Sequence, residues 1–71
     1  MELEPRIREI RENKGLKQKF VAQKTGISQQ QLSDYETGKA YPRIDKAYKI
    51  AAVLDCKVDD LYIKKEPTPN E

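Results

Sequence analysis

Residues 17–36 constrain the fold of this chain more than any other segment, because they read as two short helices separated by a tight turn. Their sequence is KQKFVAQKTGISQQQLSDYE. Gly26 adopts positive φ without steric cost, so it can end the first helix after Thr25 in a left-handed conformation. Ser28 then opens the second helix, because its hydroxyl can accept a backbone N–H bond while Gln31 reaches back in an S-x-x-Q capping box. The segment therefore predicts a helix, a turn and a second helix.

The second of these helices, expected over residues 28–36, divides into an apolar and a polar face. Leu32 and Tyr35 lie three residues apart on one side, which we expect to be buried behind Ile27. The other side is expected to face solvent and carries two i,i+4 pairs, Gln29 with Ser33 and Gln30 with Asp34.

This arrangement resembles the helix-turn-helix of the phage-repressor-like (Xre) family, from about residue 7 to about residue 61. No single residue carries the resemblance. The family spacing is matched by Gln18, Ala22, Gly26, Ile27, Leu32, Tyr35, Glu36 and Gly38, then by Tyr41-Pro42 and an IAAVLD-type helix ending. The resemblance implies an all-α, five-helix DNA-binding domain that contains a helix-turn-helix.

Composition limits the chain to one domain without room for a separate catalytic domain. It has 71 residues, of which 37% are charged and 37% hydrophobic, and no apolar run is long enough to cross a membrane. No signal-peptide segment is present either. We therefore expect a soluble, cytoplasmic protein with no membrane partner.

Metal binding and enzymatic activity are not expected from the side chains available. Cys56 is the single cysteine and cannot form an internal disulfide, and the chain has no histidine. The usual zinc ligands are therefore missing, and we expect neither a metal nor another cofactor. The sequence also lacks a nucleophile–base arrangement and a phosphate-cradling glycine loop, which argues against an enzyme.

Positive charge is concentrated on the segment that contains the helix-turn-helix. The net charge of the chain is only +2. Residues 17–49, however, carry seven Lys and Arg against three acidic residues, while residues 1–16 are balanced and residues 55–71 are net acidic. Such an uneven distribution is typical of a nucleic-acid-binding surface, although lysines also serve simply to solvate helices.

Further helices are expected on both sides of this segment. The first should begin near Pro5, whose missing N–H suits the first helical position, and end at Gly15, with Leu3, Ile7 and Ile10 as its apolar stripe. A fourth helix is expected over residues 44–54 and a last short one over residues 58–63. The stripe of the fourth contains Ile44, Ala47, Tyr48, Ala51 and Leu54, widened by Ile50 and Val53.

These helices are expected to make one domain over residues 1–63, followed by a disordered tail over residues 64–71. The tail reads KKEPTPNE, with two prolines and no hydrophobic periodicity. The predicted core consists of Ile10, Val21, Ala22, Ile27, Leu32, Tyr35, Ile50, Ala51, Leu54 and Leu61. Phe20 stands where the family has a charged residue; we expect it to pack against the first helix, the alternative being an exposed apolar patch.

The resemblance also assigns the residues that contact DNA. In the family the second helix of the motif lies in the major groove, where glutamine can pair with adenine and aspartate can accept from cytosine. The expected base-reading residues are Gln29 and Gln30, then Ser33 and Asp34. The expected phosphate-contacting residues are Gln18, Ser28, Lys39, Tyr41 and Arg43. Arg11 and Glu36 are implied as a structural pair that ties the first helix to the reading helix.

The function implied is a sequence-specific regulator, a repressor, that binds a double-stranded DNA operator as a homodimer. Val53, Tyr62 and Ile63 are candidates for an apolar dimer surface, although Tyr62 is equally suited to the core. The alternative function is that of a protein-interaction module or antitoxin-like accessory subunit, which keeps the fold but acts through a regulatory protein partner. DNA binding by the isolated chain would argue against that alternative.

Overall fold

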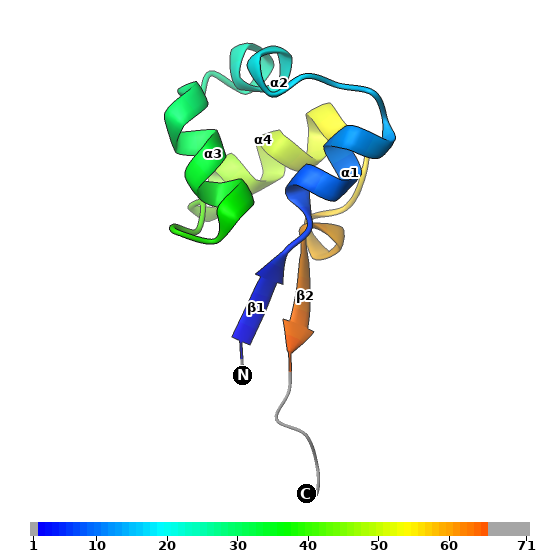
Figure 1. Ribbon diagram of the computed structural model, residues 1–71, viewed down its shortest axis with the longest axis vertical. Coiled ribbons are helices and arrows are strands. Elements are labelled where there is room, and N and C mark those ends of the chain that lie inside the picture. The colour runs from blue at the N-terminus through cyan, green and yellow to red at the C-terminus, as the bar shows by residue number, and fades with distance from the viewer. Residues whose placement is uncertain (1, 66–71) are drawn as a thin grey trace, which may run out of the picture.

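A computed structural model of the chain describes residues 2–65, which form a small helical bundle with a two-stranded sheet at one end (Figure 1). The elements in chain order are β1 (Glu2–Pro5), α1 (Ile7–Asn13), α2 (Gln18–Thr25), α3 (Gln29–Thr37), α4 (Ile44–Leu54), a 3-10 turn η1 (Val58–Leu61) and β2 (Tyr62–Lys65). No helix in this range is long and apolar enough to cross a membrane.

The expected helix-turn-helix class is confirmed, but the five-helix, all-α architecture is wrong. Within residues 2–65 the chain has four α-helices, and its two ends pair as antiparallel strands with Glu2 opposite Lys65 and Pro5 opposite Tyr62. Pro5 therefore closes β1 instead of opening α1, which starts at Ile7. Pairing with β2 satisfies backbone groups of residues 2–5 that would otherwise need water, and nothing local in the sequence indicates so distant a partner.

The expected last helix is a single 3-10 turn. Asp60 stabilises it, because its Oδ2 accepts from the backbone N–H of Lys57 at 3.0 Å. The chain then extends at Tyr62, with φ −140° and ψ 147°, and enters β2. Lys64 and Lys65, which were expected in the tail, form the end of this strand. The remainder of the expected tail, residues 66–71, lies outside the described residues.

The core contains nine of the ten expected residues, and Ile10 is the exception. Ile10 is only partly buried, whereas Ile7 is fully buried. Ile7 and Arg11 are one helical turn apart and define the inward face of α1, so Ile10 falls at its margin. The buried residues are Ile7, Val21, Ala22, Ile27, Leu32, Tyr35, Ala47, Ile50, Ala51, Leu54 and Leu61.

The apolar stripe expected on α4 is too wide. Its inward face consists of Ala47, Ile50, Ala51 and Leu54. Ile44 and Tyr48, one turn apart on a neighbouring face, are 67% and 63% exposed. The helix ends at Asp55, which takes the left-handed conformation (φ 55°) that aspartate tolerates better than most residues.

The loop between α3 and α4 is attached to the sheet through Tyr41. The Tyr41 ring lies 5.6 Å from the ring of Tyr62, centroid to centroid. Its hydroxyl donates to the backbone carbonyl of Leu3, on β1, at 3.3 Å. This contact connects the end of α3 to the two-stranded sheet.

Candidate nucleic-acid interface

The two helices of the motif meet through the turn that the sequence predicts. Gly26 ends α2 in the left-handed conformation, with φ 73°. The Ser28 hydroxyl accepts from the backbone N–H of Gln31 at 3.1 Å and so caps α3. The Gln31 side chain is engaged elsewhere, because its Oε1 accepts from Lys46 Nζ of α4 at 3.2 Å. The cap is therefore the expected serine bond, and the glutamine half of the capping box is replaced by a link to α4.

The four expected base-reading residues lie along α3 and differ in exposure. Gln29 and Gln30 are exposed, whereas Ser33 and Asp34 are half-buried. Gln30 Nε2 donates to Asp34 Oδ1 at 3.1 Å, as their i,i+4 spacing predicts. Gln29 instead donates through Nε2 to Gln18 Oε1, on α2, at 3.1 Å. The exposed polar end of α3 is thus connected to α2.

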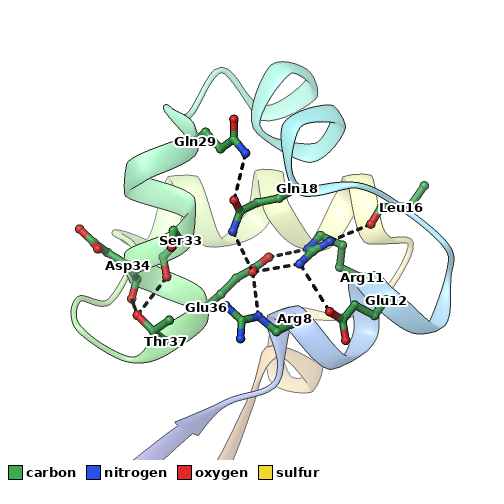
Figure 2. Close-up of polar contacts among 10 residues, drawn as sticks. All are labelled: Arg8, Arg11, Glu12, Leu16, Gln18, Gln29, Ser33, Asp34, Glu36 and Thr37. Atoms are coloured by element: carbon green, nitrogen blue, oxygen red, sulfur yellow. Dashed lines mark hydrogen bonds and ion pairs between the residues drawn. The ribbon is translucent and has the colours of Figure 1, made fainter.

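Gln18 is fixed in turn by a buried carboxylate (Figure 2). The side chain of Glu36 is fully buried, and its Oε1 accepts from Gln18 Nε2 at 3.0 Å. Because the carboxylate accepts the Gln18 amide N–H, the Gln18 carbonyl oxygen is turned toward Gln29. Figure 2 shows the resulting chain of contacts from α1 through Glu36 and Gln18 to Gln29.

Arg11 supplies the positive charge that balances Glu36. Its Nε lies 2.6 Å from Glu36 Oε2 and its Nη2 lies 3.2 Å from Oε1, in a two-pronged ion pair. Its Nη1 also donates to the carbonyl of Leu16 at 2.9 Å. The structure therefore brings Arg11 and Glu36 together, and through them joins α1, the α1–α2 loop and α3.

Arg8 is a contact of Glu36 that sequence reasoning did not identify. Its Nε lies 3.4 Å from Glu36 Oε1, so a second guanidinium borders the same carboxylate at a more exposed position. Arg8 is three residues before Arg11 and therefore shares its helix face, a spacing from which the contact could have been inferred.

The expected phosphate-contacting residues differ in their exposure and in their contacts. Ser28, Lys39 and Arg43 are exposed, and within the described residues neither Lys39 nor Arg43 makes an ion pair. Gln18 is half-buried in the Glu36 contact and retains one amide hydrogen. Tyr41 differs, because its hydroxyl hydrogen is donated to Leu3 of β1. The structure does not leave that hydroxyl as a free donor.

Phe20 does not pack against α1 as expected. It is 41% exposed, and Lys24 Nζ lies 5.6 Å from the centre of its ring. The inward face of α2 is taken by Val21, Ala22 and Thr25, so Phe20 points outward. It borders a hollow of about 420 Å³ that is also lined by Gly15, Leu16, Lys17, Lys19 and Gln23.

Two further groups, on Cys56 and Tyr62, have pKa values that are raised by burial. Burial raises the pKa of the Cys56 thiol, which makes the thiolate harder to form. Burial also raises the pKa of Tyr62 to about 12, and its hydroxyl finds no hydrogen-bond partner within residues 2–65.

Comparison with known proteins agrees with this geometry. The helix-turn-helix family model matches residues 7–61. An uncharacterized HTH-type transcriptional regulator from Archaeoglobus fulgidus is 40% identical over 58 residues, which cover 82% of this chain and 83% of that protein.

Two solved structures are similar to this chain in both fold and sequence. One is the restriction-modification controller protein C.AhdI from Aeromonas hydrophila, with TM-score 0.73 and 29% identity over 78% of this chain and 83% of that one. The other is SinR, the master regulator for biofilm formation, in complex with DNA, with TM-score 0.70 and 34% identity over 76% of this chain and 87% of that one. The chain therefore belongs to the phage-repressor-like (Xre) helix-turn-helix family.

Proposed function

We propose that the chain is a sequence-specific regulator of transcription, a repressor, that reads the major groove of its operator with residues 28–36 and binds as a homodimer. The observation that carries the proposal is the exposed pair of amides, Gln29 and Gln30, on a helix whose other end is anchored by the buried Glu36. Membership of the family and the likeness to a DNA-bound regulator support it.

Gln29 is held in a way that suits adenine recognition. A glutamine reads adenine with its carbonyl oxygen and one amide hydrogen together. The Gln29 amide has two hydrogens, of which Gln18 accepts one at 3.1 Å. The carbonyl oxygen and the second hydrogen remain for a base edge. Because Gln18 is itself fixed by Glu36, less side-chain freedom is lost when Gln29 binds.

Gln30, Ser33 and Asp34 complete the proposed reading face. The Gln30–Asp34 hydrogen bond leaves one carboxylate oxygen of Asp34 to accept from cytosine N4. An ionised carboxylate also disfavours nearby phosphate and bases without a donor, so Asp34 contributes to specificity by excluding wrong sequences.

Charged and hydroxyl groups around this face would hold the DNA backbone. Ser28 lies at the N-terminus of α3, where backbone N–H groups favour an anion. Lys39 and Arg43 follow the C-terminal end of the same helix and are exposed. Contacts to phosphate at both ends of α3 would set its register in the groove without reading sequence.

A homodimer is proposed because one short helix touches too few bases for useful specificity. Two copies related by a two-fold axis would read two half-sites, about 34–36 Å apart in related motifs. A palindromic operator recovered from random duplex DNA would support this arrangement, and a non-repeated site bound by one copy would contradict it.

The experiment that tests the proposal compares operator and random DNA for two kinds of variant. Gln29→Ala or Gln30→Ala should weaken operator binding by about 1–3 kcal/mol while leaving random DNA almost unchanged. Lys39→Ala or Arg43→Ala should weaken both DNAs together and reduce the slope of log K against log salt by about 0.9 per lost contact.

Comparing the two kinds of variant separates base recognition from non-specific binding to the DNA backbone. If alanine at both glutamines leaves the ratio of operator to random affinity unchanged, α3 does not read bases. The exposed Phe20, with its neighbouring lysines, would then favour the second candidate, a protein-interaction module that acts through a regulatory partner. In that case Phe20→Ala should abolish partner binding and leave DNA affinity unaltered.

A further inference from the structure

The two-stranded sheet has two outer edges, and its register determines which backbone groups point outward. The Arg6 N–H donates to the carbonyl of Leu61 at 2.7 Å, which continues the β1–β2 ladder by one pair. Hydrogen-bonded and non-hydrogen-bonded pairs alternate in an antiparallel ladder. The bonded pairs are therefore Arg6–Leu61, Glu4–Ile63 and Glu2–Lys65. The pairs between them, Pro5–Tyr62 and Leu3–Lys64, turn their N–H and C=O groups away from the ladder.

The outer edge of β1 is closed to further pairing. Of its two outward residues, Pro5 has no N–H to donate. The carbonyl of Leu3 already accepts from the Tyr41 hydroxyl at 3.3 Å. A third strand could not form a regular ladder with this edge.

The outer edge of β2 is open. Tyr62 and Lys64 each present an N–H and a C=O there, and within the described residues no other strand pairs with it. Figure 1 shows β1 on one side of β2 and, below η1, no helix or strand along its other side. An open edge of this kind is a template for another strand.

We propose that a second copy of this chain pairs its own β2 with this edge, antiparallel and about a two-fold axis, to give a four-stranded sheet in the order β1-β2-β2-β1. The edge is self-complementary, because Tyr62 of each copy lies opposite Lys64 of the other and both exchange N–H and C=O groups. Four backbone hydrogen bonds join the two copies, and Ile63 lies opposite Ile63 of the second copy on the axis.

Neighbouring registers are disfavoured by charge and backbone conformation. Moving the axis to Lys64 would place two ammonium groups directly opposite each other. Moving it to Tyr62 would require Asp60 to extend, but Asp60 belongs to the 3-10 turn η1 and bonds back to Lys57. The register centred on Ile63 instead brings two apolar side chains, each 44% exposed, into contact.

Charge complementarity favours a second copy as the occupant. A hollow of about 430 Å³ lies beside this edge, lined by Leu3, Val58, Asp59, Tyr62 and Lys64. In the proposed register Lys64 of the second copy lies opposite Tyr62 and so on the side of the sheet that carries this hollow. The Asp59 carboxylate makes no ion pair within residues 2–65 and can receive that ammonium group.

This inference rests on the proposed homodimer and adds the surface that forms it. Cross-linking tests the surface directly. In a Cys56→Ala background, Ile63→Cys should oxidise to a disulfide-linked dimer, because opposed residues in a non-hydrogen-bonded pair have Cα atoms about 4.5 Å apart. Leu3→Cys is the matched control, since Leu3 is 40% exposed on β1. Its two copies would be three strand spacings apart, about 14 Å, which is too far for a disulfide.

A backbone variant supplies the second measurement, by sedimentation of the full chain. Lys64→Pro removes an outward N–H from each copy without breaking the β1–β2 ladder, so it should raise the dimer dissociation constant about tenfold or more. Lys64→Ala, which keeps the N–H, should raise it much less. If the chain still dimerises, but Ile63→Cys forms no disulfide and Lys64→Pro leaves the dimer dissociation constant unchanged, β2 is not the dimer surface. The proposed homodimer would then remain, with another surface. A chain that is monomeric both free and on its operator would remove both, and would leave this edge to an extended segment of another protein.

Discussion

The ion pair between Arg11 and Glu36 gives a prediction of large magnitude. The two side chains are 10% and 0% exposed, and the shortest contact between them is 2.6 Å. Replacing Glu36 alone with leucine leaves the buried Arg11 guanidinium with the Leu16 carbonyl and the exposed Glu12 carboxylate, 4.0 Å away, as its partners. Breaking one side of a buried pair costs about 3–5 kcal/mol. In a domain of this size each kcal/mol lowers Tm by about 4–8 °C, so Glu36→Leu should lower Tm by roughly 12–40 °C.

Replacing both partners should cost much less than the single changes suggest. In the double variant Arg11→Met, Glu36→Leu no charge remains buried, and the remaining losses are the donor to Leu16 and the acceptor for Gln18, about 1–3 kcal/mol. Arg11→Met alone should be milder than Glu36→Leu, because Arg8 already lies 3.4 Å from the carboxylate and can move closer. We expect a coupling energy of about 2–3 kcal/mol between the two positions.

Urea denaturation of the four proteins in a double-mutant cycle measures this coupling. The control is the i,i+3 pair of Arg6 and Glu9, whose contact is 3.2 Å but whose side chains are 35% and 57% exposed. The same substitutions there should show no resolvable coupling, because water screens exposed pairs. A coupling at Arg11–Glu36 no larger than at Arg6–Glu9 would refute the argument, since the buried pair would then behave as two surface charges.

Two further predictions concern the core and the sheet. Leu32→Ala should cost about 2–5 kcal/mol in urea denaturation, because Leu32 is fully buried. A loss of unfolding free energy below about 1 kcal/mol would mean that neighbouring side chains move into the cavity. It would contradict close packing around Leu32. The raised pKa of Tyr62, about 12 against 10.0 for the unfolded chain, means that the native state keeps a proton that the unfolded state loses between these pH values. Stability should therefore fall as pH rises from 10 toward 12. Tyr62→Phe should reduce that fall without loss at pH 7, because the hydroxyl has no partner within residues 2–65. An equal alkaline fall in both proteins would assign it to other groups.

Much of the fold follows from short-range features of the sequence. Gly26 ends α2 with positive φ and Ser28 caps α3, and both effects depend only on residues within one turn of the chain. Apolar periodicity located nine of the ten expected core residues in the same way. The family spacing also indicated that Arg11 and Glu36 would be neighbours, 25 residues apart, which the local pattern alone does not show.

Only the tertiary structure decided what happens at the two ends of the chain and within the Glu36 contacts. Residues 2–5 and 62–65 become strands because they meet each other, and neither four-residue segment carries a local signal for a partner so distant in the chain. Gln29 bonds to Gln18 instead of Ser33 because the packing of α2 against α3 brings Gln18 Oε1 to 3.1 Å from Gln29 Nε2. Phe20 remains outside because Val21, Ala22 and Thr25 occupy the buried face of α2. Local propensity acts within one or two turns, whereas pairing and burial depend on partners that folding brings from elsewhere in the chain.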